Sequence, residues 1–321
     1  MARRVIAWSV GSALVLLIAL TLAPLVGSAP LSVREAMIPG TQDREILFGL
    51  RLPRVLIAAL AGGALAVAGL MFQTLVRDSL ADPYTLGVSS GASLGAVTAI
   101  FLGWSGAAGP MALMGAGAVL TAVMAIASSG RRMSPFTLLL AGVTANSMNI
   151  AAILFLHSLA DYGRSFTIVR WLMGGIEHPP YSTVGLLAAV VLPVVALLFR
   201  RARDWNLLAA GEEWAEARGV AAGRLTKLGY VAGSVLTAAV TCLTGPIGFL
   251  GWIVPHALRL RAGADHRLLI PCAFLLGAAF LVVCDTAART LLAPEEIPVG
   301  AITALGAGPF FLLLLRHRPE E

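Results

Sequence analysis

The chain has 321 residues, of which 58% are hydrophobic and 12% charged, and its formal net charge is +6. Soluble domains carry about 25% charged residues, and disordered chains are poor in hydrophobic ones, so both classes are excluded. Apolar stretches long enough to cross a bilayer recur from end to end. They predict a single all-α, polytopic membrane domain over residues 1–321.

The predicted membrane spans follow one another along the whole sequence. We expect the first one to be a retained span and not a cleaved leader, because its apolar core is longer than that of a signal peptide. The spans cover residues 5–27, 54–76, 86–103, 108–128, 135–158, 181–199, 228–258, 268–290 and 299–315.

The run 228–258 decides the number of spans. It contains Thr244-Gly-Pro-Ile-Gly248, a cluster that breaks helices, and splitting the run there turns nine spans into ten. Ten spans bring the basic residues Arg3, Arg4, Arg316 and Arg318 to one side of the membrane, the cytoplasmic side by the positive-inside rule. Because topology explains the basic excess, we expect no nucleic-acid partner.

Residues that carry catalysis or metal binding are scarce in the sequence. Gly87-Val-Ser-Ser-Gly91 has the G-x-S-x-G form of a nucleophile elbow, but it opens an apolar span and does not follow a strand. An intramembrane hydrolase using Ser89 or His256 is therefore a remote alternative. The sequence contains no phosphate-binding loop, no HExxH and no CxxC, so we expect no ATP hydrolysis, no metal and no cofactor on this chain.

Polar residues inside the spans are few. Asp285 is the one candidate for an intramembrane acid, and Arg289, four residues on, is placed to pair with it. An ion-coupled secondary transporter built on buried acids is therefore disfavoured, although it stays an alternative. A set of neutral polar residues either lines a pathway or forms hydrogen bonds between helices: Gln73, Thr144, Asn146 and Asn149.

Two charged groups lie outside the spans or at their ends. The cytoplasmic segment of about 201–227 contains Gly211-Glu-Glu-Trp-Ala-Glu-Ala-Arg-Gly219, which predicts a short helix with acids in its first turn and a glycine after its end. That helix is either a docking element for a soluble partner or a solvated connector. On the outer side, Arg51, Arg54 and Arg289 either receive an acidic protein surface or anchor helices at the headgroups.

With these residues in place, the chain resembles the permease subunits of type II ABC importers, which take up iron–siderophores, haem and cobalamin. The resemblance covers nearly the whole length and rests on the order and spacing of several strings. They are 51–54, 64–73, 80–83, 86–92, 140–143, 171–175, 211–219, 245–251, 254–256, 265–267, 285–289 and 296–300.

The resemblance implies ten helices, a homodimer or close heterodimer with a pathway along its two-fold axis, and two cytoplasmic ATP-binding subunits that carry ATP and Mg²⁺. A periplasmic or lipid-anchored binding protein would deliver the substrate. By likeness, Arg51, Arg54 and Arg289 dock that protein, Leu80 is a cytoplasmic gate position, and Asn146 and Asn149 line the pathway. The implied coupling residues are Gly211, Glu212, Glu213, Glu216, Ala217, Arg218 and Gly219.

The resemblance also implies a location and a class of substrate. We expect a bacterial inner-membrane protein with both termini in the cytoplasm, and a ferric siderophore as the substrate, with cobalamin or haem as alternatives. Some positions depart from the family pattern, among them the small-residue run 306–309, which is shifted by a position. Asp78-Ser79 replaces a common Asn-Pro beside the gate position, and Trp252 replaces an aliphatic residue.

Overall fold

The computed structural model describes residues 2–79, 81–128 and 134–316, and within those ranges its regular structure is entirely helical. This confirms the predicted all-α class. The helices are α1 (Ala2–Leu22), η1 (Ala23–Leu25), α2 (Val33–Ala36), α3 (Gln42–Arg44), η2 (Glu45–Arg51), α4 (Leu52–Val76), α5 (Val88–Phe101), η3 (Ser105–Ala107), α6 (Ala108–Ala127), α7 (Pro135–Leu159), α8 (Tyr162–Leu172), α9 (Tyr181–Arg200), α10 (Ala202–Ala210), α11 (Glu212–Ala217), α12 (Ala222–Thr244), α13 (Leu250–Ala262), α14 (His266–Thr290) and α15 (Val299–Arg316).

The described part of the chain has seven helical stretches that are long and apolar enough to cross a membrane. They contain α1, α4, α6, α7, α9, α12 and α14. Three further helices, α5, α13 and α15, fall on the other predicted spans. The chain is therefore a multi-pass membrane protein, and ten crossings stay a prediction that this set of helices fits.

The break predicted inside the run 228–258 is confirmed. Helix α12 ends at Thr244 and α13 begins at Leu250. The linker between them contains two residues with positive φ, Gly245 at 65° and Phe249 at 68°. A helix cannot continue through left-handed backbone, so one apolar run becomes two helices.

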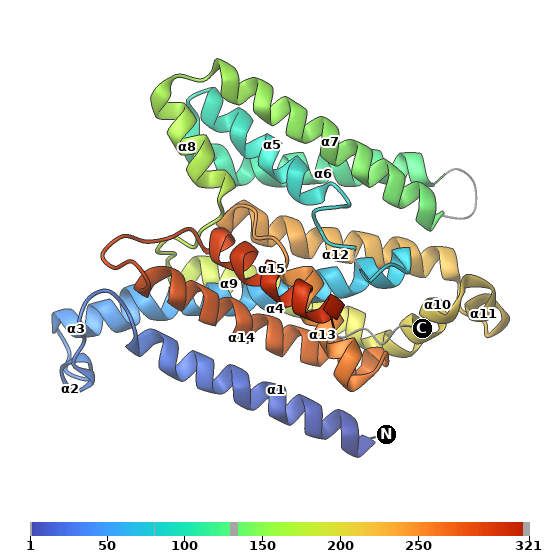
Figure 1. Cartoon of the computed structure of the whole chain (residues 1–321), viewed down its shortest axis with the longest axis horizontal. Coiled ribbons are helices and arrows are strands. Elements are labelled where there is room, and N and C mark those ends of the chain that lie inside the picture. Colours follow the sequence, from blue (N-terminus) through green and yellow to red (C-terminus); the bar gives the residue numbers. More distant parts are fainter. Residues whose placement is uncertain (1, 80, 129–133, 317–321) are drawn as a thin grey trace.

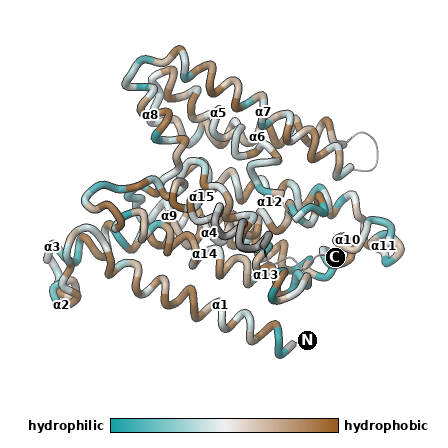
Figure 2. The backbone as a smooth tube through the Cα atoms, viewed as in Figure 1, coloured by the Kyte–Doolittle hydropathy of each residue, from teal (hydrophilic) through white to brown (hydrophobic). Residues whose placement is uncertain are grey.

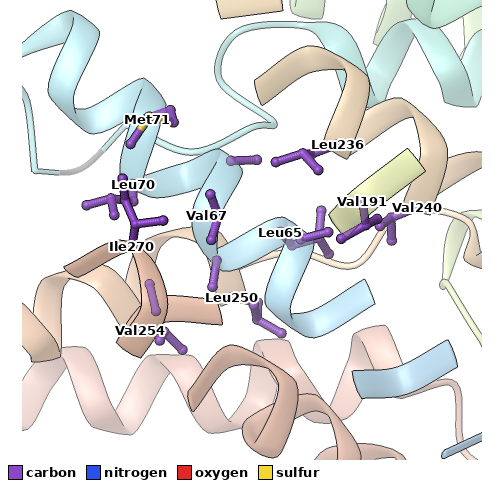
Figure 3. Close-up of a cluster of buried hydrophobic side chains, with 14 of the residues drawn as sticks. Leu65, Val67, Leu70, Met71, Val191, Leu236, Val240, Leu250, Val254 and Ile270 are labelled. Carbon is purple, nitrogen blue, oxygen red and sulfur yellow. The ribbon is translucent and has the colours of Figure 1, made fainter. Parts of the chain in front are cut away.

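Helix α4 is the centre of the packing, because nearly all of its residues are buried. Its Leu65, Val67, Leu70 and Met71 lie in a cluster with residues of α9, α12, α13 and α14 (Figure 3). An apolar helix that is covered on all sides in this way needs no polar face.

Small residues allow the close helix contacts that the glycine-rich runs predict. A methyl group at Gly69 of α4 would overlap the carbonyl oxygen of Gly251 in α13, and one at Gly115 of α6 would overlap that of Gly91 in α5. Without side chains at these positions, the backbones approach closely, as they commonly do between helices in lipid.

The helices form a main bundle around α4 and a second group of α5–α8 beside it (Figure 1). The start of α1 and the pair α10 and α11 lie at one end of the bundle, and α2 and α3 lie at the other (Figure 1). We name these the α11 end and the α2 end. Hydrophilic residues gather at both ends, and hydrophobic residues predominate along the helices between them (Figure 2).

Helices α8 and α10 were not expected from the sequence. Both are short and amphipathic, and they lie in segments that carry too many polar residues to indicate a membrane span. A side-chain cap explains where α8 begins, because the Asp161 carboxylate accepts a hydrogen bond from the Arg164 N–H at 3.0 Å.

Candidate functional site

A cavity of about 860 Å³ lies between the second helix group and the main bundle. Its wall comes from residues 82–85 ahead of α5, and from α5, α7, the end of α8, the linker between α12 and α13, α13 and the start of α15. Most of the wall is aliphatic or aromatic. Its smaller polar part consists of Asp82, Thr85, Ser90, Ser93 and Asn146.

The polar residues predicted on α7 fall in three different environments. Asn146 lies on the cavity wall. Asn149 lies behind the wall, where its amide donates a hydrogen bond to the Ser90 Oγ at 3.1 Å and joins α7 to α5. Thr144 is exposed on another face of α7 and donates to its own helix, at Leu140 O, over 2.8 Å. Asn149 therefore bonds between helices, whereas Asn146 lies on the cavity wall and its role in a pathway stays a prediction.

Gln73 is not on the cavity wall, and of its two alternatives the structure shows hydrogen bonding between helices. Its side chain is buried between α4 and α13, where it donates to Gly251 O at 3.2 Å and accepts from the Arg259 guanidinium at 2.7 Å. It joins helices because the small Gly251 leaves its carbonyl accessible across the close α4–α13 contact. Leu80, the predicted gate position, lies outside the described residues.

The loop between α4 and α5 brings Asp82 to the cavity. The Asp82 carboxylate accepts a hydrogen bond from the Tyr84 N–H at 3.2 Å, which fixes a tight turn. Burial raises the pKa of this carboxyl group to about 6, although hydrogen bonds from backbone N–H groups act in the opposite direction. Sequence inspection did not single out Asp82 for this position, because an Asp-Pro turn in a loop is ordinary.

At the α2 end, Arg54, Asp285 and Arg289 form a buried ion cluster. Asp285 accepts from Arg54 Nε on one carboxylate oxygen and from Arg289 Nε on the other, both at 3.1 Å. Arg54 also binds Glu296 at 2.9 Å, and the Glu296 side chain is 46% exposed. The predicted pairing of Asp285 with Arg289 is confirmed. The bond to Glu296 was not predicted, because nothing in a sequence shows that a loop residue reaches a helix 242 positions earlier.

Arg51 is buried at the same end and donates to two backbone carbonyls, Pro24 O at 3.1 Å and Ala29 O at 2.5 Å. In this conformation Arg51, Arg54 and Arg289 are all buried and all bonded within the chain. Burying a guanidinium group requires such partners. The docking role implied for these arginines stays a prediction, and it requires the side chains to leave the partners described here.

At the α11 end, the predicted short helix is confirmed as Glu212–Ala217, with Gly211 as its N-cap and Gly219 at a φ of 82° just beyond it. Ala215 is its buried anchor, whereas Trp214 is 60% exposed and has the Arg218 guanidinium 5.2 Å from its ring centroid. Glu212 lies 3.6 Å from Arg77 at the end of α4. The helix thus presents acids and an aromatic ring outward, and its coupling role stays a prediction.

A series of hydrogen bonds holds α10 against the start of α14. The sequence did not predict this series of bonds. The Asn206 amide donates to Asp265 at 2.8 Å, and its oxygen accepts from the His266 N–H at 2.8 Å. His266 in turn lies 2.8 Å from Thr74 of α4. Through these bonds, α10 is fixed to the two helices that form the centre of the bundle. Only the adjacent Asp265-His-Arg267 string marked this region in the sequence.

The described residues contain no group of three or more histidine, cysteine or acidic side chains that would hold a metal ion. Cys242, Cys272 and Cys284 are free thiols. Among the described residues, the cavity wall is built from apolar groups and a few hydrogen-bonding groups.

Comparison with known proteins places these features in context. The FecCD transport family matches residues 14–317. The cobalamin import system permease protein BtuC of Halobacterium salinarum is 42% identical over 281 residues, which cover 86% of this chain and 75% of that protein. The hemin transport system permease protein HmuU of Yersinia pestis is 38% identical over 324 residues, which cover 97% and 96%.

A solved structure gives the same fold. A metal-chelate type ABC transporter in an inward-facing conformation superposes with a TM-score of 0.87 at 29% identity, and the match covers 98% of this chain and 100% of that one. The named relatives are transport permeases and not enzymes.

Proposed function

Because this chain belongs to the FecCD transport family, we propose that it is the membrane permease subunit of an ATP-driven importer of metal chelates. The observation that carries the proposal is the cavity of about 860 Å³, which lies between two helix groups of a multi-pass membrane protein. A cavity of this size matches a bulky ligand better than a single ion.

The permease itself moves the ligand by alternating between conformations and catalyses no covalent step. ATP is hydrolysed by two separate subunits, which dock at α11. Glu213 and Trp214 are exposed there. The buried Ala215 anchors α11 in the bundle, so a displacement of α11 is transmitted to the other helices. ATP binding shifts the population of conformations by its different affinity for each of them.

A second copy of the chain completes the pathway. The cavity residues Ile150 and Leu154 of α7 are 46% and 62% exposed, so one copy alone does not enclose the cavity. The face of α7 around them also exposes Leu140, Val143 and Phe155. An apolar face beside an open cavity is suited to a two-fold axis, across which the same cavity of a second copy would complete the enclosure.

The chain lies in the bacterial inner membrane, with the α11 end and both termini in the cytoplasm and the α2 end outside. The basic residues Arg3, Arg4, Arg200 and Arg201 near the α11 end support this orientation. A binding protein delivers the substrate at the α2 end. The exposed Glu296, joined to Arg54, is the part of the ion cluster that such a partner meets first.

The substrate is a metal chelate: we keep a ferric siderophore as the first candidate, and the comparisons fit the alternatives, cobalamin or haem, equally well. Relatives named for cobalamin and for hemin are similar to this chain to nearly the same degree.

The test is reconstitution of the full chain in proteoliposomes with its ATPase and binding protein. We expect chelate accumulation that requires ATP and hydrolysis that the loaded binding protein stimulates. Uptake that follows an imposed proton or sodium gradient without ATP would instead support the ion-coupled secondary transporter. The bonding of Asp285 to two arginines argues against that alternative, since the acid is not free to carry a proton.

A further inference from the structure

The charge of the cavity wall restricts what the cavity accepts. Among the described residues that line it there is no Lys, Arg or His, and there is one acid, Asp82. A second identical copy would add the same side chains across the axis, so the wall of the pair would hold two acids and still no cation.

The hydroxyl groups of the serine and threonine residues on the wall do not offset this charge, because each of their protons already has an acceptor. Thr85 donates to Asp82 O at 2.7 Å, Ser90 to Gly87 O at 3.0 Å, and Ser93 to Ser89 O at 3.0 Å. A hydroxyl has one proton to donate, so these three groups can only accept from a ligand. A carboxylate or catecholate oxygen, which only accepts, finds no partner in them.

Apart from the uncharged amide of Asn146, the remaining wall offers mainly apolar and aromatic surface. Tyr84, Phe249 and Trp252 line the cavity, and the rings of Phe249 and Trp252 are 6.4 Å apart between centroids. Aromatic faces attract cations and pack against flat apolar surfaces. An anion that enters this space loses its water and gains no opposite charge, which is costly in a medium of low dielectric constant.

We infer that the cavity selects uncharged or cationic metal chelates with a large apolar surface and rejects anionic ones, and that Asp82 is a specificity-determining residue. This inference rests on the proposed function, since it names the ligand class of the same site. It favours chelates of the neutral hydroxamate and corrinoid kind over catecholate chelates and over tetrapyrroles with free carboxylates.

The experiment uses two series of chelates in which only the charge changes. The first is a ferric linear trihydroxamate with a terminal amine, used as the free amine (cationic), the N-acetyl form (uncharged) and the N-succinyl form (anionic). The second is cyanocobalamin and its monocarboxylic acid. Binding to the full chain in lipid nanodiscs is measured by quenching of tryptophan fluorescence. We expect the anionic member of a series to bind at least about tenfold more weakly than its uncharged partner.

Asp82→Asn makes the test specific for this residue, because an asparagine oxygen can still accept from the Tyr84 N–H and keep the turn. We expect this variant to bring the affinity ratio of anionic to uncharged members toward one. Glu177→Gln is the matched control, since Glu177 is exposed and not part of the wall, and it should leave the ratio as in the unaltered chain.

Equal affinity for anionic and uncharged members would overturn the inference, as would a lack of binding by every member of both series. A ratio that Asp82→Asn leaves unchanged would remove the role of Asp82. Failure of the proposed function looks different: it is chelate binding with the expected ratio but no ATP-dependent uptake. ATP-dependent uptake of the anionic members would support the proposed function and contradict the inference.

Discussion

At the α2 end of the bundle, Arg51, Arg54 and Arg289 are buried and bonded within the chain, whereas at the α11 end Glu213 and Trp214 face outward. In the sequence both groups belong to charged segments at or beyond the ends of predicted spans. The difference is that the arginines meet Asp285 or backbone carbonyls inside the fold, while α11 buries one small residue, Ala215, and makes a partly exposed pair from Glu212 to Arg77. Charge at one end is therefore paired inside the bundle, and charge at the other is exposed.

The largest expected effect comes from Asp285→Ala. This change leaves two buried guanidinium groups without their carboxylate, which costs about 3–5 kcal/mol. We expect a sharp fall in yield and in the thermal unfolding midpoint in detergent. The matched control is Glu296→Gln, at the exposed partner of Arg54, for which we expect a loss of about 1 kcal/mol or less. Equal stability of the two variants would show that the cluster does not stabilise the bundle.

The same burial changes how docking at the α2 end should be tested. Arg54→Glu would place a carboxylate against Asp285, so loss of binding-protein docking in that variant would follow from misfolding alone. Changes at the exposed Glu296 are the better probe.

Charge reversal of α11 tests the other half of the comparison. Changing Glu212, Glu213 and Glu216 together to Lys should abolish co-purification with the ATPase and leave the thermal midpoint nearly unaltered, because Glu213 and Glu216 are exposed. The control reverses three exposed acids near the α2 end, Glu35, Glu45 and Glu177. An intact complex with coupled hydrolysis after the α11 reversal would exclude this helix as the docking element.

Asp82 adds a third case to the comparison. It is an acid on a cavity wall, and the described residues of that wall include no cation. Burial raises its pKa from 3.8 to about 6, so the folded state binds the proton more tightly than the unfolded state. The stability that protonation provides is full below about pH 4 and is lost as the pH rises through about 6. Asp82→Asn should therefore raise the thermal midpoint at about pH 7.5 by a few degrees and change it much less at about pH 4.5. An equal gain at both pH values would show that the buried charge of Asp82 does not lower the stability.

The smallest effect is expected from Arg77→Gln, which removes the 3.6 Å pair with Glu212. Both side chains are partly exposed, and pairs of this kind contribute about 0–1 kcal/mol. The thermal midpoint should stay close to that of the unaltered chain, at low and high salt alike. A large loss would show that α11 depends on this pair as well as on Ala215.

The sequence predicted the helices of this protein well because membrane helices must satisfy their own backbone hydrogen bonds and bury apolar side chains, and both demands are local. The break after Thr244 shows this, since glycine and proline stop a helix wherever it lies. The short helix at 212–217 and the pairing of Asp285 with Arg289 follow equally from residues close together in the chain.

The site was decided by tertiary structure. Gln73 and Asn146 are both polar residues within apolar helices, and no local pattern tells which one meets a carbonyl and which one meets a cavity. The same holds for Arg54, whose partners are 231 and 242 positions away. The sequence by itself determined where the helices are and that they cross a membrane. Which polar side chains are sealed inside and which remain open to a ligand or a partner depended on how those helices pack, because burial is a property of neighbours and not of the residue.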